Sequence, residues 1–148
     1  MRIRYATAAD IPNLMALEKH VATAAHWSMK QYETVFSAQP PPRVMLIIEN
    51  EAGVQGFIVG RTLEKEWEIE NIVVAGSVRR CGLGARAVAD FLELARDRGA
   101  DTVFLEVRES NVAARRLYEK LAFMERGRRK LYYQDPAEDA IVYQFTLP

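Results

Sequence analysis

The sequence predicts an α/β domain built around a mixed β-sheet, with residues 1–148 forming one unit. Three observations support this fold class. The length of 148 residues suits one domain, since domains commonly span roughly 100–200 residues. Residues 44–74 contain apolar runs separated by turn residues, which is typical of an antiparallel meander. An apolar stripe at helical spacing then separates the runs 67–74 and 102–107, which predicts a helical crossover between parallel strands.

The individual elements follow from local signals, beginning with a short strand at residues 2–5. Thr7 followed by Asp10 resembles a capping box and predicts the start of a helix. Ser28 followed by Gln31 predicts a second, short helix in the same way. The remaining elements are expected to be strands at 44–49, 54–61, 67–74 and 102–107, helices ending near Arg98 and Leu121, and a closing hairpin of 123–133 and 140–147.

The charge balance restricts the possible partners. The chain carries 20 Lys or Arg and 20 Asp or Glu residues, whereas nucleic-acid binding usually requires a clear basic excess, so we expect no binding to DNA. The N-terminal residues lack the apolar core of a signal peptide, and no run approaches the ~18 apolar residues of a membrane span. These features predict a cytoplasmic protein without membrane association. Cys81 is the only cysteine, which excludes an intrachain disulfide and a multi-cysteine metal site, and no metal is expected.

The turn between the run 67–74 and the helix after it carries a pattern suited to anions. A strand, a glycine-containing turn and a helix together aim backbone N–H groups and the positive end of the helix at a phosphate. The glycines allow close approach to the backbone, and the arginines supply positive charge. The turn therefore predicts a pyrophosphate cradle, formed by Arg79, Arg80, Cys81, Gly82, Leu83, Gly84 and Ala85.

Two alternative interpretations of this turn stay open at the level of the residues. Gly82, Gly84 and Ala87 also satisfy the dinucleotide-binding fingerprint G-x-G-x-x-A. In that fingerprint the first glycine follows its strand almost directly, whereas residues 75–81 intervene here, which disfavours a dinucleotide. The second alternative is a turn with a purely structural role.

The spacing Arg79-x-x-Gly82-x-Gly84, between a strand and a helix, resembles the acetyl-CoA pyrophosphate loop of the GNAT superfamily of N-acetyltransferases. The order of predicted elements also resembles that fold. Residues 105–123 are similar to the RimI-type branch, whose members acetylate the N-terminal alanine of a small-subunit ribosomal protein. Further matches to this branch, which bring the resemblance to nearly the whole chain, are Trp27-Ser28, Tyr132-Tyr133 and Glu138-Asp139-Ala140-Ile141.

The resemblance implies a mixed, mostly antiparallel sheet in which a central parallel pair, 68–74 and 102–107, splays apart. Acetyl-CoA would be the co-substrate, with its pantetheine arm in the wedge and its pyrophosphate on the loop amides. The resemblance also assigns Asn111 a contact with CoA, in addition to the helix cap that its side chain can provide. A backbone amide of the segment Ile72, Val73 and Val74 would hydrogen-bond the acetyl group.

Two side chains are candidates for the chemistry. Glu106 lies late in an apolar strand, where a carboxylate is unfavourable unless it faces a cleft or has a partner. The resemblance assigns this position the proton acceptor, acting through water, and the alternative is an exposed carboxylate at the end of a strand. Tyr118 lies two helical turns beyond Asn111, on the same helix face. In the family this tyrosine protonates the departing CoA thiolate, and the alternative is a tyrosine of the core.

The acceptor side is indicated by a run of alternating carboxylates at Glu64, Glu66, Glu68 and Glu70. If this run is extended, its carboxylates share one face, which is either a solvated sheet face or a site for a basic peptide. A nearby basic run could contact ribosomal RNA or the adenosine phosphate of CoA, or belong to a solvated hairpin; it consists of Arg126, Arg128, Arg129 and Lys130. The side chains proposed to contact the acceptor are Trp27, Glu68, Glu70 and Tyr132.

These features predict an acetyl-CoA-dependent N-acetyltransferase that acts by direct attack in a ternary complex. The expected acceptor is a protein N-terminus, and the resemblance suggests the N-terminal alanine of a ribosomal protein. The nearest alternative keeps the reaction and replaces the acceptor with a small amine or a lysine side chain. A non-catalytic acyl-CoA-binding domain is a third hypothesis. Glu106 and Tyr118 argue against the third, since a pure binder needs neither.

Overall fold

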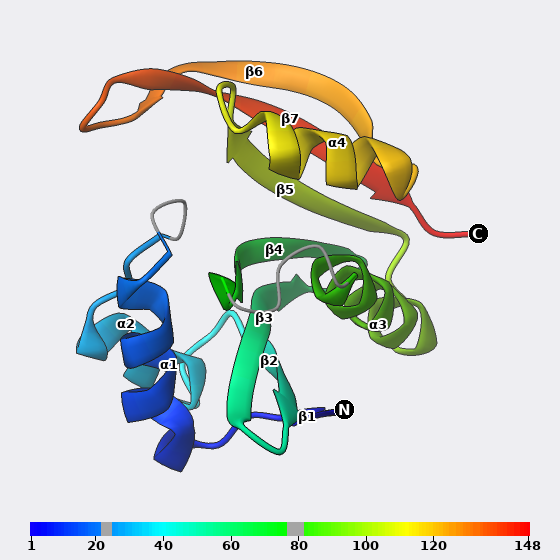
Figure 1. Ribbon diagram of the computed structural model, residues 1–148. Helices are drawn as coiled ribbons and strands as arrows, with labels where there is room; N and C mark the ends of the chain where they lie inside the picture. Colours follow the sequence, from blue (N-terminus) through cyan, green and yellow to red (C-terminus); the bar gives the residue numbers. More distant parts are fainter. Residues whose placement is uncertain (22–24, 77–81) are drawn as a thin grey trace.

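The computed structural model describes residues 1–21, 25–76 and 82–148. A seven-stranded sheet organises these residues, with helices on both of its faces (Figure 1). The elements in chain order are β1 (Arg2–Tyr5), a 3₁₀ helix (Ala8–Asp10), α1 (Ile11–Lys19), α2 (Met29–Val35), β2 (Arg43–Asn50), β3 (Gly53–Leu63), β4 (Glu66–Val74), α3 (Leu83–Asp97), β5 (Thr102–Arg108), α4 (Val112–Lys120), β6 (Met124–Tyr133) and β7 (Glu138–Thr146).

The strand order is β1-β2-β3-β4-β5-β7-β6, and the predicted fold class is confirmed. Neighbouring strands are antiparallel except for β4 and β5, which are parallel and joined by the crossover helix α3. Both predicted capping boxes form, at Thr7 with Asp10 and at Ser28 with Gln31. The first of them opens the 3₁₀ helix, and α1 continues directly from it.

Two apolar clusters fill the two faces of the sheet. Helix α3 contributes the apolar stripe predicted from its spacing, and with α4 it packs on one face. Gly60 of β3 makes this packing possible, because a Cβ there would come within 2.5 Å of the Phe91 ring. Helices α1 and α2 pack on the opposite face, where Val73 of β4 and Phe57 of β3 are buried. No helix in the described ranges is both long and apolar enough to cross a membrane.

Strand β4 has two features that shape the site. Its register with β3 shifts at Val59 and Gly60, which pair with Asn71 and Ile69, so Glu70 is an extra residue in β4. The row of four carboxylates that an extended run from Glu64 to Glu70 would give is not formed, because β4 begins only at Glu66. Glu64 lies in the β3–β4 turn with φ of 53°, outside the strand, because the chain needs a left-handed residue there to reverse direction.

Candidate active site

A wedge opens between the two parallel strands. Pairing of β4 with β5 is limited to Glu66–Ile69 against Thr102–Leu105, although both strands continue beyond it. Figure 1 shows β4 and β5 diverging from this paired end, with β6, β7 and α4 on the side of β5. The splayed parallel pair implied by the sequence is thus present in the sheet.

The backbone of β4 faces the wedge at two positions. The N–H of Ala75 donates to the carbonyl oxygen of Gln55 in β3, at 2.7 Å. Because hydrogen-bonding direction alternates along a strand, the peptide groups of Ile72 and Val74 point away from β3, toward β5. By the same alternation, the peptide group of Val73 points toward β3. The Val73 side chain is buried in the cluster that includes residues of α1 and α2. Ile72 and Val74 can therefore offer backbone N–H groups to a ligand in the wedge.

The start of α3 also lies beside this part of β4. Gly82 caps the helix in a left-handed conformation with φ of 78°, and it provides no side-chain hydrogen bond to the first turn. Gly84 lies next to Leu117 of α4 and Val74 of β4, since a Cβ there would be 3.4 and 4.0 Å from their side chains. Leu83 is buried in the core, and Ala85 follows in the first turn. Arg79, Arg80 and Cys81 of the predicted cradle lie outside the described residues.

Helix α4 brings the other two residues assigned to the CoA side. The Asn111 side chain caps the helix by accepting a hydrogen bond from the N–H of Ala114, at 3.2 Å. Tyr118 is buried between Phe123 and Tyr143, with ring centroids 5.8 and 6.2 Å away. Burial raises the pKa of the Tyr118 phenol, so the hydroxyl stays protonated at neutral pH and can donate a hydrogen bond or a proton.

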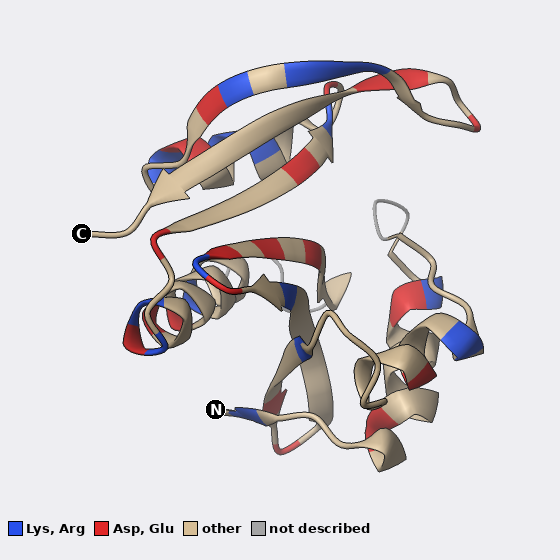
Figure 2. Ribbon diagram, turned by 180° about the vertical axis from the view of Figure 1, so that it is seen from behind, with Lys and Arg blue, Asp and Glu red and all other residues tan. Residues whose placement is uncertain are grey.

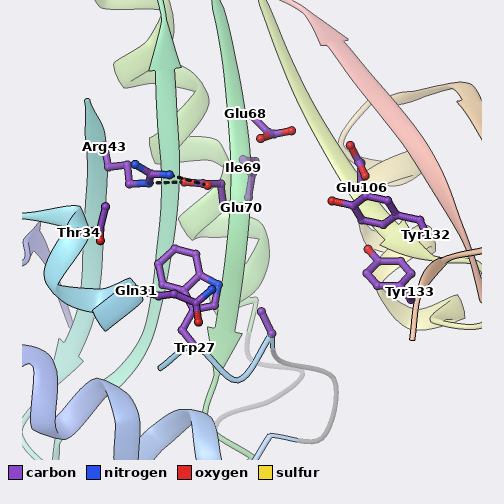
Figure 3. Close-up of a pocket in the computed structure, with 11 residues that line it drawn as sticks. Trp27, Gln31, Thr34, Arg43, Glu68, Ile69, Glu70, Glu106, Tyr132 and Tyr133 are labelled. Atoms are coloured by element: carbon purple, nitrogen blue, oxygen red, sulfur yellow. Dashed lines mark hydrogen bonds and ion pairs between the residues drawn. The ribbon is translucent and has the colours of Figure 1, made fainter. Parts of the chain in front are cut away.

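An open pocket of about 340 Å³ lies on the α1–α2 side of β4 and β5 (Figure 3). All four residues predicted to contact an acceptor line it, together with the predicted base. Figure 3 shows the Tyr132 and Tyr133 hydroxyls directed into the pocket from one side, with Trp27 and Gln31 opposite. The lining residues are Ala25, Trp27, Gln31, Thr34, Arg43, Glu68, Ile69, Glu70, Glu106, Tyr132 and Tyr133.

Glu106 occupies the point where the wedge and the pocket meet. It directly follows Leu105, the last β5 residue paired with β4. Its side chain is 14% exposed, and Oε1 lies 3.2 Å from Nε of Arg129 in β6. The other oxygen, Oε2, is buried and has no hydrogen-bond partner among the described residues. A buried carboxylate oxygen without a donor is unfavourable, so Oε2 is suited to accept a hydrogen bond from a ligand or a water.

The Glu106 charge acts on the neighbouring tyrosines. It is the main cause of the raised pKa of Tyr132, whose ring also stacks against the Arg129 guanidinium at 5.5 Å. Burial and the same carboxylate raise the pKa of Tyr133 to about 12. Both phenols therefore remain neutral hydrogen-bond donors in the pocket.

The β4 carboxylates in the pocket are partly neutralised by arginines. The Glu70 carboxylate accepts hydrogen bonds from Nε and Nη2 of Arg43 in β2, at 3.0 and 3.3 Å, in a bidentate ion pair. Glu68 lies 2.7 Å from Nε of Arg61 in β3. Burial nevertheless raises the pKa of Glu68, and the charges of Glu106 and Glu70 add to this effect. Figure 2 shows the acidic bands of β4 and the basic bands of β6.

Several lining residues were absent from the sequence prediction. Tyr133 could have been found, because it adjoins Tyr132 at the end of a predicted strand. Arg43 could not, because its pairing with Glu70 depends on β2 and β4 lying on either side of β3. Gln31 and Thr34 carry no signal beyond their place in a short helix.

The wedge, the glycine-initiated helix and the carboxylate between two openings are the arrangement expected of an acyl-CoA-dependent transferase. The Acetyltransferase (GNAT) family model matches residues 11–123. The chain belongs to this family and is an acetyl-CoA-dependent N-acetyltransferase. The family predicted from the loop and the downstream segment is confirmed.

The similar proteins include members of the RimI-type branch. The ribosomal protein bS18-alanine N-acetyltransferase of Escherichia coli K12 is 33% identical over 135 residues, which cover 90% of this chain and 88% of that protein. The Haemophilus influenzae protein of the same name is 37% identical over 99 residues, covering 65% and 66%. The crystal structure of the ribosomal-protein-S18-alanine N-acetyltransferase from Escherichia coli superimposes with a TM-score of 0.86 at 29% identity, covering 98% of this chain and 92% of that one. The predicted similarity to this branch is also confirmed.

Proposed function

We propose that this protein transfers the acetyl group of acetyl-CoA to the N-terminal α-amino group of a ribosomal protein that begins with alanine. One observation carries the proposal. The wedge that would hold the acyl donor and the pocket that would hold the acceptor meet at Glu106, whose Oε2 is buried without a partner among the described residues. The relatives named above act on such an alanine and support this choice of acceptor.

Bound in the wedge, acetyl-CoA supplies a thioester that an amine can attack. The peptide groups of Ile72 and Val74 would orient it and donate hydrogen bonds to the acetyl oxygen, where negative charge develops. The N-terminus of α3 at Gly82 would face the pyrophosphate, since uncapped helix N–H groups favour anions. Asn111, Arg79, Arg80 and Cys81 complete the proposed set on the CoA side.

Glu106 would accept the proton that the amine loses. Only the neutral amine has the lone pair for attack, and an α-amino group has a pKa of about 8, against about 10.4 for lysine. An α-amine is therefore easier for a carboxylate to activate at neutral pH. Glu106 Oε2, which has no partner among the described residues, would receive this proton directly or through one water, and the ion pair with Arg129 would orient Oε1.

Tyr118 would donate a proton or a hydrogen bond to the sulfur of the leaving thiolate. Burial raises its pKa, so the phenol is protonated at the pH of the reaction. Its position on α4, two turns beyond the cap Asn111, puts it on the helix that packs with α3 on one face of the sheet. This assignment gives each of the two proposed catalytic side chains one proton transfer.

The pocket offers carboxylate oxygens to an amine acceptor. Three carboxylates line it, and each is paired with an arginine: Glu68 with Arg61, Glu70 with Arg43 and Glu106 with Arg129. Glu106 Oε2, which has no partner among the described residues, can still accept a hydrogen bond from the acceptor. Trp27 and Tyr132 add aromatic surface against which the first residues of a peptide can pack. These contacts suit the basic N-terminal segment of a ribosomal protein.

The proposal is tested by measuring release of CoA with three acceptors. These are a basic peptide that begins with alanine, the same peptide with a blocked N-terminus, and a polyamine. We expect turnover with the free N-terminus only. Turnover of the blocked lysine-containing peptide or of the polyamine would instead identify a side-chain or small-amine acceptor. Tight binding of acetyl-CoA without turnover of any acceptor would indicate a binding domain.

A further inference from the structure

A second carboxylate, Glu18 of α1, lies beneath the pocket and takes no part in the reaction described above. Glu18 is buried, with only 2% of its surface exposed. Oε1 accepts hydrogen bonds from the N–H of Trp27 at 2.8 Å and from the Tyr32 hydroxyl at 2.7 Å. Oε2 accepts from the side-chain amide of Asn71 at 2.8 Å. These three partners are neutral.

The chemistry of this cluster requires an acceptor at its centre. Burial, reinforced by the hydrogen bond to Glu18, raises the pKa of Tyr32, so its hydroxyl stays protonated and donates. The backbone N–H of Trp27 can only donate. An ionised carboxylate satisfies all three donors, and hydrogen bonds to a charged group are stronger than neutral ones. Burying a charge is nevertheless unfavourable, so a position of this kind calls for a role beyond filling space.

The three partners belong to parts of the site that are far apart in the sequence. Trp27 forms one wall of the pocket, and its ring also packs edge-on against Tyr32 at 5.6 Å. Asn71 follows the extra residue of β4, between Glu70, which lines the pocket, and Ile72, whose peptide group faces the wedge. Glu18 thus connects Trp27, whose side of the pocket is termed the Trp27 wall, to β4, the strand that would align the acetyl group.

We propose that Glu18 is a positioning residue that sets the spacing between the Trp27 wall and β4, and thereby places the acceptor amine against the acyl donor. The identity of the acceptor in this inference rests on the proposed function. The effect of Glu18 on the position of Trp27 is independent of that function. Loss of the carboxylate should loosen the Trp27 wall, weaken acceptor binding and leave the acetyl-CoA side intact.

Steady-state kinetics of three variants distinguish an effect of Glu18 on the position of Trp27 from a general loss of folded protein. Glu18→Leu removes both acceptor oxygens at similar size, and we expect the KM for the alanine peptide to rise about tenfold or more. The KM for acetyl-CoA should stay within about twofold. Glu18→Gln should keep the peptide KM within about threefold of the wild type, because Asn71 can rotate its amide to accept from the new NH₂ group. Tyr32→Phe is the matched control, since it leaves the connection between Trp27 and Asn71 unbroken.

A spectroscopic readout tests the wall without any substrate. The chain contains two tryptophans, so protein labelled with 5-fluorotryptophan gives one ¹⁹F resonance from Trp27 and one from the buried Trp67. In Glu18→Leu the Trp27 resonance should shift or broaden, while that of Trp67 stays in place. The Trp67 signal also reports whether the variant is folded.

The outcomes separate the two proposals. A folded Glu18→Leu protein with an unchanged Trp27 resonance, or with an unchanged peptide KM, overturns the role of Glu18. Equal rises in the KM for peptide and for acetyl-CoA also overturn it. If wild-type protein turns over no peptide, the proposed function fails, and the ¹⁹F spectrum alone decides the inference. If Glu18→Leu does not fold, Asn71→Ala takes its place, with a rise in peptide KM expected and an unchanged KM contradicting the proposal.

Discussion

The two openings that meet at Glu106 are built in different ways. The wedge presents peptide groups of β4 and the first turn of α3, whereas the pocket presents side chains from α2, β2, β4, β5, β6 and the segment before α2. Backbone N–H groups hydrogen-bond to parts that all acyl-CoA molecules have in common, such as the phosphates and the thioester carbonyl. Side chains can distinguish one acceptor from another. The donor side should therefore tolerate most side-chain changes, while the acceptor side should respond to charge and shape.

Glu106→Gln tests the residue common to both openings and should have the largest effect. The amide keeps the shape of the carboxylate but cannot accept the amine proton. We expect kcat to fall by about 10²–10⁴, with little change in the KM for acetyl-CoA. Turnover close to that of the wild type would reassign the role of the base.

Tyr118→Phe tests the donor side through the leaving group. The ring packing on Phe123 and Tyr143 is retained, so the melting temperature should change little. Without the phenol, kcat should fall by about 10²-fold at an unchanged peptide KM. A loss confined to stability would identify Tyr118 as a core residue only.

Charge reversal on the acceptor side separates the two openings. In the double variant Glu68→Lys, Glu70→Lys, two pocket carboxylates become ammonium groups near Arg43 and Arg61. The KM for a basic peptide should rise about tenfold or more, because like charges now face each other. The KM for acetyl-CoA should be unchanged, and a peptide without basic residues is the control. An unchanged KM for the basic peptide would indicate a solvated sheet face.

Gly82→Val is the corresponding change on the donor side. A β-branched residue in the left-handed conformation at φ of 78° is strained by about 1–2 kcal/mol. If the start of α3 shifts to relieve this strain, it no longer presents the same N–H groups, and the KM for acetyl-CoA should rise roughly five- to thirtyfold with the peptide KM unchanged. Gly127→Ala is the matched control, because a Cβ at Gly127 meets nothing within 4 Å and its φ is ordinary. Equal effects of the two variants would remove the special role of Gly82.

The smallest expected effect is the pH dependence of acceptor binding. Because the pKa of Glu68 is raised by burial, its carboxylate becomes protonated at a higher pH than an ordinary glutamate, whose pKa is 4.5. As the pH falls through this range, the pocket loses negative charge. The affinity for the N-acetylated basic peptide, which has no α-amine to titrate, should decrease. Glu68→Gln should weaken this dependence, and an unaltered profile would assign it to other groups.

The difference between the openings also explains what the sequence could predict. The helix start beside the wedge follows from a local signal, because the spacing of Gly82 and Gly84 between a strand and a helix is visible in a short segment. The wedge itself was expected only from the resemblance to the GNAT superfamily. Glu106 could be identified because a carboxylate in an apolar strand is unfavourable unless it faces a cleft or has a partner. Whether the extended run reached back to Glu64 could not be decided from the sequence, because alternation alone cannot show where a turn ends.

The contacts inside the pocket could not be predicted in the same way. Arg43 neutralises Glu70 only because β3 brings β2 and β4 to a fixed separation. Glu18 resembles any polar residue of an amphipathic helix until Trp27, Tyr32 and Asn71 are placed around it. Such contacts depend on register and helix packing, which no local pattern encodes.

The central claim is that the donor and the acceptor meet at Glu106, and a bisubstrate complex tests it most directly. The ligand is CoA joined through its acetyl carbon to the α-nitrogen of an alanine peptide, and the measurement is a crystal structure with wild-type protein. We expect CoA between β4 and β5, the peptide against Trp27 and Tyr132, and the α-nitrogen within about 3 Å of Glu106 Oε2 or one water away from it. A peptide that leaves the wedge on the opposite face, with Glu106 turned away from the nitrogen, would contradict the account.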